Sequence, residues 1–140
     1  MGIAELKDLV FNGKLEDAMI HIGQLSADDI LEGEIWKAFI FHRRGAYDTS
    51  ISIIDEVLRH TSIALELQFL SLVIKAYSFG LIPNREQTNK TILEAEEILN
   101  RLPEAERKEN LIWEGIMFHV KVMIAIDVDE DLALAEEYSE

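Results

Sequence analysis

The sequence predicts an all-α protein, and three of its features support this fold class. Apolar residues recur at steps of three and four along most of the chain, which is the spacing of amphipathic helices. No stretch of any length alternates apolar and polar residues in the manner of a half-buried strand. Only two prolines and seven glycines interrupt the 140 residues, so long ordered segments are expected. About eight helices, paired in four antiparallel hairpins, account for this pattern.

Glycines are predicted to separate the first four helices. A short helix over 3–10 precedes Gly13, and the third helix ends at Gly45. Glycine enters the positive-φ region without strain and commonly closes the last turn of a helix. Ser26, with Asp29 three places later, resembles a capping box and predicts the start of the third helix. The apolar stripes of the second, third and fourth helices contain Leu15, Ala18, Met19, Ile22 and Leu25, then Leu31, Ile35, Trp36, Phe39 and Ile40, then Tyr47, Ile51, Ile54 and Leu58.

The second half of the chain is predicted to hold four more helices around one long connection. Thr61 or Ser62 caps a helix that runs through Ser78, and a connection over 80–89, longer than the others, follows. A last helix begins near Asp129, with acids in its first turn, where the helix dipole favours them. The stripes between contain Ile92, Ala95, Leu99 and Leu102, ending at Pro103, then Ile112, Ile116, Val120 and Met123. One domain over 1–140 is expected, with hairpins over about 2–25, 27–60, 62–102 and 104–138.

A repeat spacing accompanies the helical pattern. Gly13 and Gly45 are 32 residues apart, close to the period of about 34 residues in tetratricopeptide repeats. The residues that match this family's small, aromatic and apolar positions are Ala38, Phe41, Gly45, Tyr47 and Ile51. The chain therefore resembles the tetratricopeptide-repeat (TPR) family, although Ser50 replaces the favoured alanine and Trp36 is off the usual register. The resemblance implies a right-handed stack of hairpins, a TPR-like α-solenoid. An irregular helical bundle is the alternative.

Composition and charge exclude several classes of function. The chain has no cysteine, so disulfides, thiolate zinc sites and cysteine nucleophiles are excluded. Its 13 Lys and Arg residues stand against 27 Asp and Glu residues, a formal charge of -14 that repels nucleic acid and anionic lipid and favours cationic partners. The N-terminus lacks the pattern of a signal peptide, and no uninterrupted apolar run is long enough to span a membrane. We expect a cytoplasmic protein with no membrane or nucleic-acid partner.

No metal, cofactor or catalytic site is predicted. The run Asp127, Asp129, Asp131 begins like a calcium loop, but Leu132 stands where glycine is needed and Tyr138 where glutamate is needed. No nucleophile has a plausible base and no glycine-rich phosphate loop is present, so the chain is not expected to be an enzyme. No two histidines share a helical turn, as metal-binding pairs do; they are His21, His42, His60 and His119.

The most concentrated basic patch is His42, Arg43 and Arg44. It lies at the predicted C-terminus of the third helix, where cations offset the helix dipole and bond the last carbonyls. This structural role is the main interpretation of the patch, and contact with an anion is the alternative.

The resemblance implies a partner-binding groove lined by the first helix of each hairpin. In this family that concave groove holds an extended peptide or a helix of a partner. The family's two-carboxylate clamp is not reproduced, because Ile35 and Phe39 occupy two of its positions. The alternative is that Trp36, Phe39 and Trp113 fill the core. The groove residues implied by the resemblance are Glu32, Ile35, Trp36, Phe39, Arg43, Leu70, Ile74, Tyr77, Met117, Phe118 and Lys121, with Ser71 and Glu114 beside them.

The function expected from these features is that of a non-enzymatic protein interaction module or scaffold. Its groove would hold a peptide or helix of a partner protein, and the acidic surroundings would favour basic segments. Two alternatives remain open. The chain is a sensory or oligomerising part of a longer regulator that forms a homodimer through its C-terminal helix, or it is an irregular helical-bundle enzyme with a site beneath the connection over 80–88.

Overall fold

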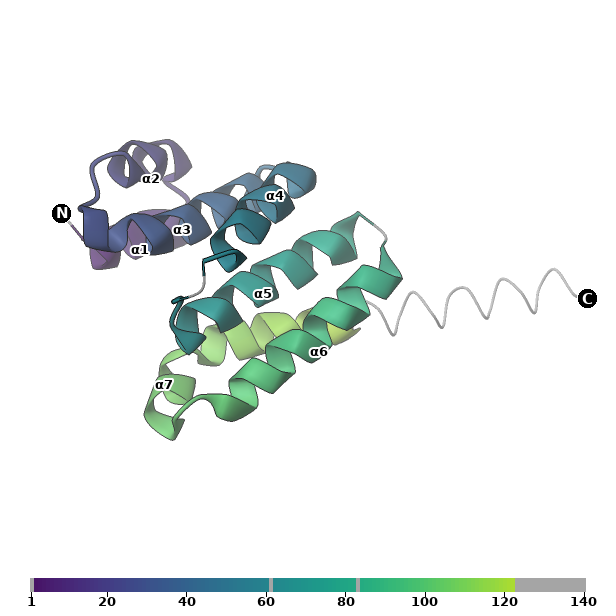
Figure 1. Ribbon diagram of the computed structural model, residues 1–140. Coiled ribbons are helices and arrows are strands. Elements are labelled where there is room, and N and C mark those ends of the chain that lie inside the picture. Colours follow the sequence, from purple (N-terminus) through teal and green to yellow (C-terminus); the bar gives the residue numbers. More distant parts are fainter. Residues whose placement is uncertain (1, 61, 83, 123–140) are drawn as a thin grey trace, which may run out of the picture.

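All the described residues belong to helices or the short segments between them. The computed structural model describes residues 2–60, 62–82 and 84–122, and these form eight α-helices and one 3-10 turn with no strand. The all-α prediction is therefore confirmed for this part of the chain. The elements are α1 (Ile3–Phe11), α2 (Leu15–Ile22), η1 (Ala27–Asp29), α3 (Ile30–Arg43), α4 (Tyr47–Leu58), α5 (Leu65–Leu81), α6 (Arg85–Arg101), α7 (Glu104–Glu109) and a helix over 111–122 (Figure 1).

Helices that follow one another in sequence pack together in space. α1 contacts α2, α3 contacts α4, and α5 contacts α6, while α3 also lies against α1, α2 and α5. Helix 111–122, yellow-green in Figure 1, runs along α6 and beneath α5. A Cβ placed on Gly80 of α5 would lie 3.6 Å from Cγ1 of Val120, so the two helices approach closely there. The result is one continuous hydrophobic core that includes residues of α1 through α6 and of helix 111–122.

The two predicted glycine helix ends share one geometry. Gly13 and Gly45 have φ values of 75° and 83°. At Gly45 the amide donates to the carbonyl of His42 at 3.0 Å, and the next amide, of Ala46, donates to Phe41 at 2.9 Å. The same pair of bonds closes α1, where Gly13 donates to Val10 at 3.1 Å and the following amide to Leu9 at 2.9 Å. Both ends are Schellman motifs, which satisfy the last carbonyls of the helix and reverse the chain.

The predicted capping box at the start of α3 is wrong. The hydroxyl of Ser26 donates to the carboxylate of Asp29 at 3.3 Å, and no side chain caps a backbone amide there. Residues Ala27–Asp29 form a 3-10 turn instead, and α3 begins at Ile30. Because aspartate has a shorter side chain than glutamate, it meets the serine hydroxyl rather than the backbone amide behind it.

The long connection predicted over 80–89 is also wrong. α5 begins at Leu65, with Ala64 in the N-cap position in place of Ser62, and continues past Gly80 to Leu81. α6 begins at Arg85, where Asn84 accepts a hydrogen bond from the amide of Gln87 at 3.2 Å. Thr61 lies outside the described residues. Only 82–84 separate the two helices, so the connection under which the alternative enzyme site was expected is short.

Buried threonines explain why the start of α6 was missed. Thr88 and Thr91 are both buried, and each hydroxyl donates to a backbone carbonyl one turn earlier at 2.7 Å, Asn84 for the first and Gln87 for the second. Threonine can occupy core positions when its hydroxyl is satisfied in this way. A search for apolar residues alone therefore begins the helix too late, at Ile92.

The buried face of helix 111–122 differs from the predicted apolar stripe. Its buried residues are Trp113, Met117 and Val120, whereas Ile112 is 61% exposed and Ile116 is half-buried. The bulk of Trp113 determines this register, because its ring packs against α3. Met123 and the last helix predicted from Asp129, with the second half of the hairpin over 104–138, lie outside the described residues.

Candidate functional site

The predicted concave groove is filled by aromatic side chains of the chain itself. The ring of Trp113 lies 5.5 Å from that of Trp36 and 5.5 Å from that of Phe39, so α3 and helix 111–122 meet directly. Trp36 is 1% exposed. Aromatic pairs at these distances stabilise a contact by more than the burial of their surface alone, so they favour direct packing of α3 against helix 111–122. The interpretation of Trp36, Phe39 and Trp113 as core residues is therefore confirmed.

Six of the predicted groove residues are buried in this core. They come from α3, α5 and helix 111–122, and their apolar side chains form part of one hydrophobic core. We therefore correct the prediction that they line an open groove for Ile35, Trp36, Phe39, Leu70, Ile74 and Met117.

Glu32 lies at the edge of the aromatic core and is half-buried. Burial raises the pKa of its carboxyl above the usual value, and the nearby Lys7 ammonium and the Trp36 indole partly offset this effect. The Glu66 and Asp29 carboxylates raise the pKa of Glu32 further. The ammonium of Lys7 lies 6.0 Å from the Trp36 ring, a cation–π contact that closes this edge.

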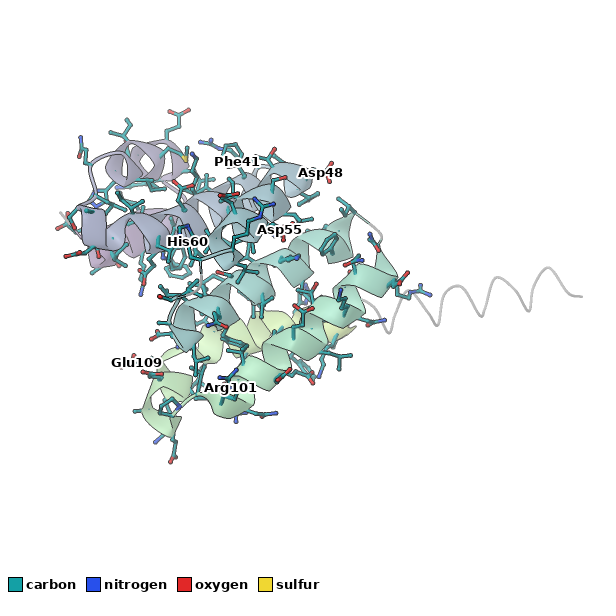
Figure 2. All side chains as sticks on the ribbon, in the orientation of Figure 1. Phe41, Asp48, Asp55, His60, Arg101 and Glu109 are labelled. Atoms are coloured by element: carbon teal, nitrogen blue, oxygen red, sulfur yellow. The ribbon has the colours of Figure 1, made fainter. Side chains whose placement is uncertain are left out.

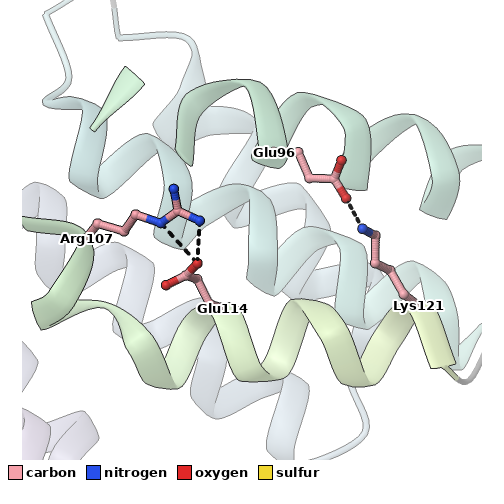
Figure 3. Close-up of polar contacts among 4 residues, drawn as sticks. All are labelled: Glu96, Arg107, Glu114 and Lys121. Carbon is pink, nitrogen blue, oxygen red and sulfur yellow. Dashed lines mark hydrogen bonds and ion pairs between the residues drawn. The ribbon is translucent and has the colours of Figure 1, made fainter. Parts of the chain in front are cut away.

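The remaining predicted residues do not share one surface. Phe118 is 67% exposed and faces a groove of about 570 Å³ between α6 and helix 111–122. Two ion pairs flank this groove, Arg107 with Glu114 at 3.1 Å and Lys121 with Glu96 (Figure 3). Because its charges are of both signs and paired, the groove has little preference for a cationic or an anionic partner. Arg43 and Tyr77 lie elsewhere, on the cavity described below.

A second groove, missed by the sequence analysis, lies between the start of α3 and one side of α4, from Thr49 to Val57. It has a volume of about 540 Å³. We call it the acidic groove. Glu34 and Glu56 are the charged residues that line it; no lysine or arginine is part of its lining, but Arg59 beside it pairs with Glu56. Its residues are Ala27, Ile30, Leu31, Glu34, Thr49, Ser52, Ile53, Glu56, Val57 and His60.

The floor of the acidic groove is apolar and accessible. Ile30 is 54% exposed, and Leu31 and Ile53 are half-buried. Figure 2 labels two further carboxylates on α4, Asp48 and Asp55, of which Asp55 pairs with Lys75 of α5 at 2.7 Å. The sequence does contain an indication of this site. α3 and α4 carry more apolar residues than a single buried stripe on each helix would need.

A smaller cavity lies at the other end of α3, where the predicted basic patch is found. His42 is 6% exposed, and burial, with a smaller contribution from Arg43, lowers its pKa from 6.5 to about 4. The prediction that His42 is a cation at the helix end is therefore wrong at neutral pH, while Arg43 and Arg44 remain exposed there. The imidazole Nδ1 instead lies 2.9 Å from the hydroxyl of Ser78, which donates to that of Ser50 at 3.4 Å.

Two absences concern the described part of the chain alone. Between residues 2 and 122, apart from the two undescribed positions, no group of three His, Asp or Glu side chains is arranged to hold a metal ion. Asp127, Asp129 and Asp131 lie outside this part. Among the helices described, none is both long and apolar enough to cross a bilayer.

Comparison with known proteins adds no relative. No protein-family model, no curated protein and no solved structure matches the chain. The likeness to tetratricopeptide repeats thus depends on the residues quoted above, and it stays a prediction.

Proposed function

We propose that the protein is a non-enzymatic interaction module, built from stacked TPR-like helix hairpins, whose acidic groove binds a basic amphipathic segment of a partner protein. The acidic groove is the observation that supports this proposal. It combines an accessible apolar floor with two carboxylates and lacks any lysine or arginine in its lining. The identical Schellman motifs at Gly13 and Gly45, 32 residues apart, support the repeated hairpin.

The chemistry of the groove selects the occupant. Apolar side chains at helical spacing on a partner would fill the floor over Ile30, Leu31 and Ile53 and supply most of the affinity. Lysines and arginines beside them would face Glu34, and would compete with Arg59 for Glu56. The formal charge of -14 would accelerate the encounter with a basic segment and oppose association with a second acidic copy of the chain. A homodimer through the C-terminal helix lies outside the described residues and is not part of this proposal.

Binding of a defined peptide tests the proposal. A fluorescent amphipathic helix of leucine and lysine should raise its anisotropy on addition of the protein, and a leucine–glutamate counterpart should not. Ile30→Ala should weaken binding about tenfold, because it removes an exposed floor residue. Glu34→Gln should weaken it about two- to fivefold at low salt and less at high salt.

Two matched variants on α6 serve as controls. Leu93→Ala removes an exposed apolar residue, and Glu94→Gln removes an exposed carboxylate, both away from the groove. If the α6 variants weaken binding as much as the groove variants do, the peptide binds the molecule without using the acidic groove, and the proposal is wrong.

A further inference from the structure

The cavity beside His42 is formed by four helices that come together at the C-terminal end of α3. It has a volume of about 430 Å³, within the range of about 300–1,000 Å³ that is usual for small-molecule sites. We call it the His42 cavity. Its lining residues are Phe39, His42 and Arg43 of α3, Tyr47 of α4, Tyr77 and Leu81 of α5, and Ile116 of helix 111–122.

Aromatic rings form most of the walls. The His42 ring stacks on Phe39 with an interplanar angle of 11° and a centroid distance of 6.1 Å. Its centroid is 4.2 Å from that of Tyr77 and 5.4 Å from that of Tyr47. Leu81, which is 36% exposed, adds an aliphatic side chain at the rim. Walls of this kind favour a planar aromatic ligand, which can stack on one ring and meet the edge of another.

The charge of the lining is opposite to that of the molecule. No carboxylate lines the cavity, whereas Arg43 does. Within residues 2–60, 62–82 and 84–122, the guanidinium of Arg43 has no ion-pair partner, and the phenol oxygens of Tyr47 and Tyr77 make no hydrogen bond. Arg44 and Arg101 likewise have no ion pair in this part of the chain, so what distinguishes Arg43 is its place on the cavity wall. These three donors favour an anion, and Arg43 opposes a cation despite the aromatic faces.

Buried hydrogen bonds hold His42 in place at the cavity wall. Nδ1 of the imidazole bonds the hydroxyl of Ser78, which bonds that of Ser50, and both serines are 0% exposed. These bonds connect α3, α5 and α4, so they fix the ring orientation before any ligand arrives. Because the Ser78 hydroxyl donates its one proton to Ser50, it accepts from Nδ1–H of His42, and Nε2 of the neutral ring is an acceptor.

We infer that the His42 cavity binds a small planar aromatic carboxylate, with its ring between the aromatic walls and its carboxylate on Arg43. The guanidinium offers the paired donors that suit a carboxylate. The phenols of Tyr47 and Tyr77 supply further donors. This site is distinct from the acidic groove, because the two share no lining residue and use opposite halves of α3, about 13 Å apart along the helix.

Three indole compounds of similar size test the inference on the full chain by isothermal titration calorimetry. Indole-3-acetate is an anion, indole-3-acetamide is neutral and tryptamine is a cation. We expect saturable binding of the acetate at least about tenfold tighter than that of the acetamide, and no saturable binding of tryptamine. Equal affinity for all three, or no binding of the acetate at millimolar concentration, would overturn the inference.

Single substitutions then locate the site. Arg43→Gln should lower the affinity for the acetate about tenfold and leave the acetamide unchanged, because only the carboxylate uses the guanidinium. Arg44→Gln, an adjacent exposed arginine that does not line the cavity, is the matched control and should change neither. Leu81→Trp fills the cavity from its rim and should abolish binding of both compounds. Binding that survives Leu81→Trp in the folded protein would place the ligand elsewhere and refute the assignment.

Discussion

Burial, more than position along the helix, determines the charge of His42. The residue lies in the last turn of α3, where a cation would be favoured, yet its ring is enclosed by Phe39, Tyr47 and Tyr77. Loss of hydration opposes the charged imidazole more strongly than the helix dipole favours it. From the sequence, the position at the helix end could be predicted. The enclosure could not, because it depends on residues far away along the chain.

The stability of the protein should therefore fall as the pH is lowered from 6.5 to about 4. The pKa of His42 is about 4 in the folded protein and near 6.5 when unfolded, so the unfolded chain binds more protons in this window. The full stabilisation is present above pH 6.5, and a loss on the order of 3 kcal/mol is expected by pH 4. Urea unfolding at a series of pH values measures it.

A variant separates His42 from other titrating groups. His42→Gln keeps a polar side chain near Ser78 and should remove this pH dependence. Glu32 acts in the opposite sense, because its raised pKa makes the folded state lose stability as the pH rises through that pKa. The pH dependence of stability with and without His42→Gln is therefore best compared in a Glu32→Gln background. An unchanged slope in His42→Gln would show that another group is responsible.

The aromatic core makes a second prediction at the residue scale. Trp36→Ala and Phe39→Ala should each lower the free energy of unfolding by about 3–5 kcal/mol, because both rings are buried against Trp113. Phe118→Ala should change it by less than about 0.5 kcal/mol, since that ring is exposed. Chemical denaturation followed by circular dichroism measures both. A small effect of Trp36→Ala would contradict its place in the core.

Among the elements, helix ends marked by glycine were predictable and those marked by other residues were not. Gly13 and Gly45 predict their Schellman motifs because the positive-φ region excludes most other residues. The start of α6 depends on Asn84 and on buried threonines whose hydroxyls bond the backbone. Such positions look polar in a sequence, so the hydrophobic period alone misplaces the helix.

Alanine substitutions should distinguish a glycine at a helix end, Gly45, from a glycine inside a helix, Gly115. Gly45→Ala should lower the free energy of unfolding by about 1–2 kcal/mol. The φ of Gly45 is 83°, a backbone conformation that is strained for alanine even though no neighbouring atom lies within 4 Å of the added Cβ. Gly115, within helix 111–122, has a negative φ, and a Cβ added there would have no other atom within 4 Å. Gly115→Ala should therefore raise stability by up to about 1 kcal/mol. The opposite order in thermal or urea unfolding would contradict the assignment of the helix end.

For the whole molecule, the sequence predicts which faces of helices are apolar but not which distant helices meet. Trp36 and Phe39 belong to α3, and Trp113 lies more than 70 residues later. Their contact closes the space where a concave groove was predicted, and the accessible surfaces lie elsewhere, in the acidic groove and the His42 cavity. These two sites also differ in charge, since Glu34 and Glu56 line the acidic groove and Arg43 lines the His42 cavity.

The most direct test of the proposed function is a map of the peptide on the protein by ¹H–¹⁵N NMR. On titration with the leucine–lysine peptide, the largest amide shifts should cluster at η1, the first turns of α3 and α4 from Thr49 onward, around Ile30, Glu34 and Glu56. Amides near Phe118 and His42 should move little. Shifts centred on α6 and helix 111–122, or none at a peptide concentration that saturates the anisotropy signal, would contradict the acidic groove as the binding site.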